Sequence, residues 1–163
     1  MPRAYLSLGS NLGDREALLR RALSRLAAVA QVIAVSSFYE TEPVEFNEQP
    51  RFVNCAVLIA TSKTPQELMA SLLDIERQLG RQRVQKKGPR LIDIDILLFD
   101  DYVITSNELT IPHPAMQQRR FVLEPLVEIA ADAVHPVLKK TIRELLDALP
   151  PGQKVTKLQI NES

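Results

Sequence analysis

The chain of 163 residues contains no tryptophan and a single cysteine, Cys55. One cysteine cannot form a disulfide within the chain, and because Cys55 lies in an apolar run we interpret it as a small core side chain; the alternative is a reactive thiol. Lysine plus arginine number 20, as do aspartate plus glutamate, so the net charge is zero. No overall field therefore draws the protein to nucleic acid or to an acidic membrane, and any anion site must come from a local cluster of cations.

Long apolar segments are missing as well. No stretch reaches the roughly 20 residues that a membrane span needs, and residues 1–5 contain no apolar run typical of a signal peptide. We therefore expect a cytoplasmic protein with no membrane partner and no nucleic-acid partner. No internal repeat, low-complexity tract or linker interrupts the sequence. We expect one domain over residues 1–163, with a mobile tail over roughly the last ten residues.

Strand and helix patterns alternate along the first hundred residues. Runs of β-branched and aromatic residues predict four strands, over 4–9, 32–39, 52–61 and 91–99. Apolar residues at helical spacing predict one helix between the first two strands, with Asn11 as its N-cap, and a second helix between the last two. This second helix starts at a capping box, Thr64 with Glu67, and stops at Gly80. Two further helices are expected in the C-terminal third, the later one starting at Thr141.

The order β-α-β-β-α-β is that of the ferredoxin-like fold. We therefore predict an α+β protein, an antiparallel sheet with helices on one face, followed by a C-terminal helical extension. The opposite face of the sheet would be free to carry a site. The fold alone does not decide the function, because the same architecture serves RNA-binding modules, small-molecule sensors and two-metal nucleotide enzymes.

Two aspartates in the fourth predicted strand, Asp93 and Asp95, are the first candidates for chemistry. Side chains alternate across a strand, so both carboxylates share one face while the neighbouring isoleucines face the core. Their Cα atoms are expected about 7 Å apart, close enough for both acids to reach one hard cation or a pair of cations. Magnesium commonly takes one or two carboxylates together with substrate phosphates. The alternative is that both acids simply face water.

The segment before this strand is basic and contains no acid. Its cations are Arg81, Arg83, Lys86, Lys87 and Arg90. A solvated loop could carry the same charges. Here, however, cations and metal-type acids flank one turn, which is what a polyphosphate with bound magnesium requires on its two sides. We therefore favour a phosphate site.

Three other positions stand out by residue type. His113 lies between two prolines, with Arg119 and Phe121 following within eight positions; a structural imidazole is the alternative. Phe52 opens the third strand and Asn54 shares its face. A core position is the alternative for Phe52, whereas a buried amide needs hydrogen-bond partners, which a heterocycle can supply.

Two other features are interpreted as structural. The loop over residues 9–14 lacks the lysine and serine or threonine of a P-loop and the glycine spacing of a dinucleotide site, so we expect a tight turn before a helix. Within it, Asp14 places a negative charge near the start of that helix. The second histidine, His135, precedes a proline and is interpreted as a structural imidazole.

Taken in order, these motifs resemble the 6-hydroxymethyl-7,8-dihydropterin pyrophosphokinase family of folate biosynthesis. The matching blocks are residues 8–13, 37–41, 52–54, 88–97 and 111–121. The resemblance covers essentially the whole chain apart from its C-terminal end. It departs at Lys87, where family members often carry tryptophan.

The resemblance implies that the β,γ-diphosphate of ATP is transferred to the hydroxymethyl group of the pterin with release of AMP. It implies two magnesium ions as cofactors, ATP and the pterin as small-molecule partners, and a monomer. Asp93 and Asp95 would hold the metals and, with Arg81 and Arg90, form the catalytic group. The implied ATP-binding residues are Glu76, Arg81, Arg83, Arg90, Ile96, Thr110, His113 and Arg119.

The same resemblance implies a pterin site made of Thr41, Val44, Phe52, Asn54 and Phe121. Phe52 and Phe121 would sandwich the ring. Asn54, Thr41 and the backbone of Val44 would read its edge.

Two other functions use a comparable fold. An RNA-binding module would need aromatic side chains on its central strands and a basic surface, but the first strand offers only Tyr5 and the net charge is zero. A different two-metal nucleotidyl-transfer or cyclase-type enzyme would share the carboxylates but not Phe52, Asn54 and Phe121. Pterin binding distinguishes between these functions.

Overall fold

The structure is a computed structural model that describes residues 1–10, 14–42, 52–81, 92–152 and 154–158. Six strands form one antiparallel sheet in the order β5-β1-β4-β3-β8, and β2 also pairs with β4. The bounds are β1 Arg3–Ser10, β2 Gln31–Val35, β3 Tyr39–Thr41, β4 Phe52–Ala60, β5 Asp93–Phe99 and β8 Val155–Lys157. The strand expected over 32–39 is thus two strands, because β2 and β3 pair with opposite ends of β4.

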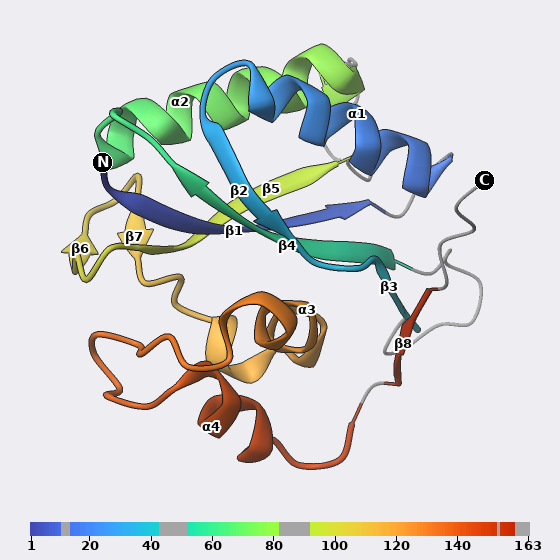
Figure 1. Cartoon of the computed structure of the whole chain (residues 1–163), viewed down its shortest axis with the longest axis vertical. Helices are drawn as coiled ribbons and strands as arrows, with labels where there is room; N and C mark the ends of the chain where they lie inside the picture. Colours follow the sequence, from blue (N-terminus) through green and yellow to red (C-terminus); the bar gives the residue numbers. More distant parts are fainter. Residues whose placement is uncertain (11–13, 43–51, 82–91, 153, 159–163) are drawn as a thin grey trace.

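Helices α1 (Arg15–Ala27) and α2 (Pro65–Glu76) cover one face of this sheet (Figure 1). The capping box at Thr64 forms as predicted. The predicted N-cap of α1 is wrong: the cap is Asp14, whose carboxylate accepts the N–H of Ala17 at 3.1 Å, while Asn11 lies outside the described residues. A carboxylate satisfies a free amide at this end and is also favoured by the helix dipole.

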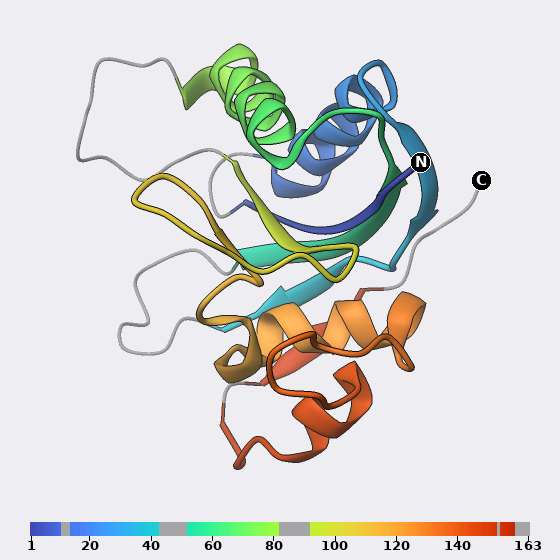
Figure 2. The ribbon, with the colours of Figure 1, turned by 90° about the vertical axis from the view of Figure 1, so that its left-hand side faces the viewer.

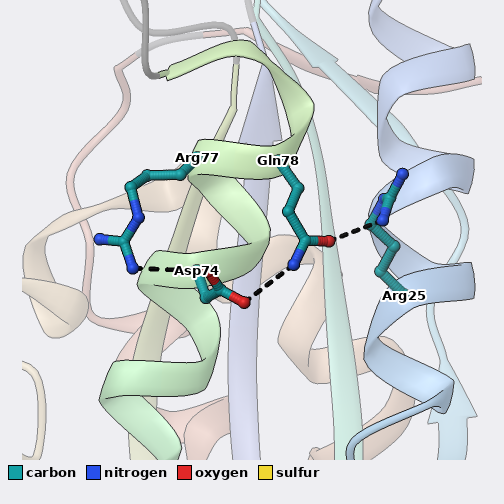
Figure 3. A network of polar contacts seen from close by, with 4 residues as sticks. All are labelled: Arg25, Asp74, Arg77 and Gln78. Atoms are coloured by element: carbon teal, nitrogen blue, oxygen red, sulfur yellow. Dashed lines mark hydrogen bonds and ion pairs between the residues drawn. The ribbon is translucent and has the colours of Figure 1, made fainter.

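Beyond Glu76, α2 continues as a π-helical turn, η1 (Arg77–Arg81), which Gly80 permits with a φ of 121°. A polar network joins this turn to α1 (Figure 3). Gln78 accepts from Arg25 at 2.6 Å and donates to Asp74 at 2.8 Å, and Asp74 also pairs with Arg77. The end of α2 is therefore tied to α1 where the chain enters the basic segment.

The opposite face of the sheet is not free, and this part of the prediction is wrong. Helix α3 (Arg120–Ala130) packs on it and α4 (Ile142–Asp147) packs against α3, so the molecule has a helical layer on each side of the sheet (Figures 1 and 2). The reason is a second apolar core, in which Val122, Leu123 and Leu126 of α3 pack with Ala56 and Leu98 of the sheet. Both capping-box bonds of Thr141 and Glu144 form at the start of α4.

The predicted fold class is nevertheless confirmed: the first hundred residues form the βαββαβ unit, with β2 and β3 together in the place of its second strand, and α3 and α4 are the C-terminal helical extension. β8 falls within the stretch expected as a mobile tail, yet it pairs with β3, so that tail does not include Val155–Lys157. The short elements β6 (Ile104–Thr105), β7 (Thr110–Ile111) and η2 (Met116–Gln118) connect β5 to α3. No helix among the described residues could cross a bilayer.

Two of the structural interpretations also agree with the structure. Cys55 is 1% exposed, and burial raises the pKa of its thiol to about 12, which makes it an unreactive core side chain. His135 is buried, and its Nδ1 accepts the backbone N–H groups of Val137 and Leu138.

Candidate active site

One end of β3 and β4 carries buried polar side chains. The register sets Tyr39 opposite Asn54 and Thr41 opposite Phe52, so these side chains lie on the face that also carries α3. Thr41 and Asn54 are only 1% and 5% exposed. Within the part of the chain that the structure describes, Thr41 Oγ1 and Asn54 Oδ1 have no hydrogen-bond partner. Because buried oxygens are nearly always paired, these two are suited to a polar ligand.

Asn54, Gly9 and Asp93 form a row across three neighbouring strands. Gly9 of β1 is opposite Asn54 of β4 on one side and opposite Asp93 of β5 on the other. A β-carbon on Gly9 would overlap the side-chain nitrogen of Asn54, which therefore lies directly over the glycine. The missing side chain lets the Asn54 amide extend toward the aspartates.

Asp93 and Asp95 lie on one face of β5, as the alternation predicted. Asp93 is half-buried and Asp95 is exposed, whereas Ile94 and Ile96 point into the first core. Three metal-binding side chains of the His, Cys, Asp or Glu type do not cluster anywhere in the described ranges. Two carboxylates on one face of a strand are still a suitable donor set for magnesium, which can complete its shell with phosphate oxygens and water.

A cavity of about 320 Å³ opens beside β5, between α2 and the segment around β7. Five of the residues that the sequence singled out line it: Glu76, Asp95, Ile96, Thr110 and His113. Apolar side chains of α2 form another part of its wall. The structure therefore brings half of the implied ATP-binding residues together with one of the two aspartates, in a cavity of a size typical of ligand sites.

Glu76 and Ile96 contribute different groups at this cavity: Glu76 a side chain that bonds to β5, and Ile96 its backbone. Glu76 is 3% exposed, and its Oε2 accepts the backbone N–H of Ile94 at 2.7 Å, which ties α2 to the open edge of β5. Backbone groups two residues apart on a strand point to the same side, so those of Ile96 also point away from β1. They can thus meet the edge of a heterocycle in the cavity.

His113 lies between the cavity and the start of α3. Burial lowers the pKa of His113; Asp95 opposes this and Arg119 reinforces it, so the imidazole is neutral at neutral pH. Its Nδ1 accepts the backbone N–H of Ala115 at 3.1 Å, and its own backbone N–H donates to Leu97 at 3.0 Å. A neutral ring that accepts through Nδ1 carries its hydrogen on Nε2, which makes that nitrogen a donor for a ligand.

Arg119 and Phe121 lie at the start of α3, close to His113. The Arg119 guanidinium lies over the Phe121 ring at 5.7 Å, and its charge acts on His113. Phe121 packs at the edge of the second core, at the first turn of α3. The start of the helix therefore presents a cation near His113 and an aromatic ring beside that cation.

Four predicted residues are not placed by the structure. Val44, Arg83 and Arg90 lie outside the described residues, and of Arg81 only the backbone, at the end of η1, is described. Sequence reasoning, for its part, missed Gly9 as a member of the site. No local pattern could have revealed it, because its importance comes from the strand register that sets it between Asn54 and Asp93.

Comparison with known proteins decides the family. The sequence model of the family 7,8-dihydro-6-hydroxymethylpterin-pyrophosphokinase (HPPK) matches residues 5–131. The chain belongs to the HPPK family. It is 50% identical over 128 residues to the 2-amino-4-hydroxy-6-hydroxymethyldihydropteridine pyrophosphokinase of Bacillus subtilis, covering 77% of each chain. The protein of the same name from Methylorubrum extorquens is 44% identical over 154 residues, which are 93% of this chain and 96% of that one.

Longer relatives contain a comparable segment. The folic acid synthesis protein fol1 of Schizosaccharomyces pombe is 44% identical over 149 residues, and the chain spans about a fifth of the length of that relative. A solved structure of Plasmodium falciparum HPPK-DHPS superposes with a TM-score of 0.72 at 19% identity, over 90% of this chain and 41% of that one, which shows the shared fold. The family resemblance and the pyrophosphokinase class that it implies are confirmed, while the roles of single residues stay predictions.

Proposed function

We propose that this protein transfers the diphosphate of ATP to the hydroxymethyl group of 6-hydroxymethyl-7,8-dihydropterin and releases AMP. Membership of the HPPK family supports the activity. The observation that carries its assignment to this site is that the aspartates of β5 lie between two different subsites. On one side is the cavity lined by Asp95, and on the other are the buried oxygens of Thr41 and Asn54, which have no hydrogen-bond partner among the described residues.

In this proposal, ATP binds in the cavity beside β5. The backbone of Ile96 and the Thr110 segment hold the base, and the apolar wall from α2 excludes water from it. The Nε2–H of His113 and the guanidinium of Arg119 donate to phosphate oxygens, where a planar cation can form two parallel bonds. Arg81, Arg83 and Arg90 are further phosphate contacts predicted from the sequence.

The pterin binds at the other side of the aspartates. Phe52 and Phe121 stack on the flat ring, and the oxygens of Thr41 and Asn54 accept from its amino and ring N–H groups. A ring that lacked these donors would leave two buried oxygens unpaired, which disfavours apolar competitors. This recognition holds the hydroxymethyl group toward Asp93 and Asp95.

Asp93 and Asp95 are the proposed ligands of two magnesium ions. When bound there, the metal supplies positive charge that stabilises the phosphoryl oxygens. The chain itself contributes the alignment of the pterin hydroxyl with the β-phosphorus, which is the larger part of catalysis for this class of reaction. No side chain is required as a nucleophile. A monomer in the cytoplasm is the state predicted for this enzyme from its sequence.

Product identity tests the proposal. Purified protein is mixed with ATP, magnesium and the hydroxymethyl-dihydropterin, and the nucleotides are separated. We expect AMP and the pterin diphosphate in equal amounts. ADP as the product would indicate transfer of a single phosphoryl group, and nucleotide release that does not depend on the pterin would refute the proposal.

An RNA-binding module is disfavoured by the fold itself. Such modules stack bases on an open sheet face, whereas α3 packs on that face here.

A further inference from the structure

A second polar cluster lies where β3 meets α3, behind the pterin end of the site. Glu128 of α3 accepts three hydrogen bonds through its two carboxylate oxygens. The Tyr39 hydroxyl donates to Oε1 at 2.6 Å, and the backbone N–H and hydroxyl of Ser37 donate to Oε2 at 3.0 and 3.1 Å. We call Ser37, Tyr39 and Glu128 the β3 clamp. The mechanism proposed above gives these three residues no task.

The clamp acts on the strand that carries Thr41. β3 is only three residues long, and within it Tyr39 is opposite Asn54 while Thr41 is opposite Phe52. Two residues along a strand span about 7 Å, so a shift of Tyr39 moves Thr41 with it. The bonds to Ser37 also fix the point at which the chain leaves β2 and enters β3. The position of the edge-reading oxygens therefore depends on where Glu128 holds this short strand.

The clamp also affects the position of Phe121, one of the two aromatic rings proposed to stack on the pterin. Phe121 and Glu128 are seven residues apart in α3, which is two helical turns or about 10 Å, so both lie on the same side of the helix. Fixing Glu128 against β3 therefore also sets how far Phe121 stands from Thr41 and Phe52. The two walls of the proposed ring slot, one on the sheet and one on α3, are joined by one carboxylate.

Attachment of α3 to the sheet does not depend on this carboxylate. Val122, Leu123 and Leu126 already pack against Ala56 and Leu98 in the second core. Apolar packing is not directional, whereas hydrogen bonds fix distance and angle. The clamp is thus better suited to setting the spacing of the slot than to holding the helix in place.

The charge state of Glu128 suits this task. Partial burial raises the pKa of Glu128, but the bonds from Tyr39 and Ser37, aided by the charge of Lys157, lower it by more. The group is therefore ionised at neutral pH, and its hydrogen bonds are of the stronger, charge-assisted kind.

We propose that Glu128 is a positioning residue for the pterin, which sets the distance between the ring of Phe121 and the edge-reading pair Thr41 and Asn54. This inference rests on the proposed function, because it assigns Glu128 to the pterin half of the site. Among the described residues, no hydrogen bond joins the clamp to the cavity beside β5. ATP binding should therefore be independent of Glu128.

The test compares Glu128→Ala and Tyr39→Phe with a control on the same helix, Glu124→Gln. Glu124 lies one turn earlier and pairs with Arg120 at 3.4 Å; its charge reaches Tyr39, but no hydrogen bond joins the two in the described structure. Dissociation constants for the pterin and for a nonhydrolysable ATP analogue are measured by calorimetry, and KM for each substrate by AMP release.

We expect Glu128→Ala to weaken pterin binding about fivefold, the loss of part of a charged hydrogen-bond set, with the affinity for the ATP analogue unchanged. Tyr39→Phe should have a smaller effect of the same kind, and Glu124→Gln none. Glu128→Gln should restore part of the loss, because its oxygen can still accept from Tyr39.

Equal losses for both ligands would overturn the inference, since they would indicate general loosening of the structure. Unchanged pterin affinity in Glu128→Ala would overturn it as well. If that variant does not fold, Tyr39→Phe decides, because it removes one hydroxyl and keeps the ring. A wild-type protein that makes no AMP would refute the proposed function, whereas AMP formation with a pterin KM unaffected by the clamp variants would refute this inference alone.

Discussion

The side-chain amide of Asn54 lies over Gly9, in the space that a β-carbon at residue 9 would need. The two residues are register partners on β1 and β4, and Asp93 is the partner of Gly9 on its other side. The absence of a side chain at Gly9 is therefore part of the site, although glycine itself offers no chemistry.

Gly9→Ala should displace the Asn54 amide and weaken pterin binding about tenfold, because Oδ1 of Asn54 would no longer face the ring. The atom that must move is the end of a side chain, so the fold should survive. Titration of the variant with the pterin measures the effect. Gly152→Ala is the matched control, because its β-carbon would meet only a backbone oxygen at 3.8 Å. An unchanged pterin affinity in Gly9→Ala would contradict the placement of Asn54.

Asp95→Asn should abolish AMP formation while leaving stability nearly unchanged. Asp95 is exposed on β5, and substitutions at exposed positions change the free energy of unfolding by about 0.5 kcal/mol or less. The neutral amide is a poor ligand for magnesium. Turnover and urea denaturation are measured side by side, with Asp101→Asn, an exposed aspartate in the turn after β5, as the control. Substantial turnover in Asp95→Asn would argue against its role as a metal ligand.

Glu76→Ala should lower the free energy of unfolding by about 1 to 3 kcal/mol, because the N–H of Ile94 loses its acceptor in a buried place. Glu76→Gln should retain most of the stability, since its side-chain oxygen can accept the same bond. Chemical denaturation of both variants gives the difference. If the glutamine variant binds ATP normally while the alanine variant is destabilised, Glu76 acts on ATP only through the position of β5.

Stability should depend on pH through Glu128 and Tyr39. The pKa of Glu128 is lowered in the folded protein, so its contribution is present above the unfolded value of about 4.3 and is lost as the pH falls through the lower folded value. Burial and the bond to Glu128 raise the pKa of Tyr39, so its contribution is present below about 10 and is lost at strongly alkaline pH. Thermal denaturation across the pH range measures both effects.

The matched comparison for this pH dependence is Glu128→Gln. That variant should flatten the acidic limb of the stability profile, because the side chain no longer titrates. An acidic limb identical to that of the wild type would mean that other carboxylates account for it.

The order of the main strands and helices in the first hundred residues, the two capping boxes and the alternation of Asp93 with its isoleucine neighbours were predictable from the sequence. They depend on local effects: the two-residue period of a strand, the helical period of an apolar stripe, and side chains that bond their own backbone. The family could also be inferred, because its motifs are short runs of adjacent residues.

What lay beyond the sequence were relationships between distant residues. The break between β2 and β3, the cover of α3 over the sheet, the row of Asn54, Gly9 and Asp93, and the contact of Glu128 with Tyr39 join segments up to 89 residues apart. Composition and periodicity determined which residues face a core and which are candidates for a site. Only the packing of α3 against one register of the sheet decided which of them meet, because that choice is made by long-range contacts for which no local pattern exists.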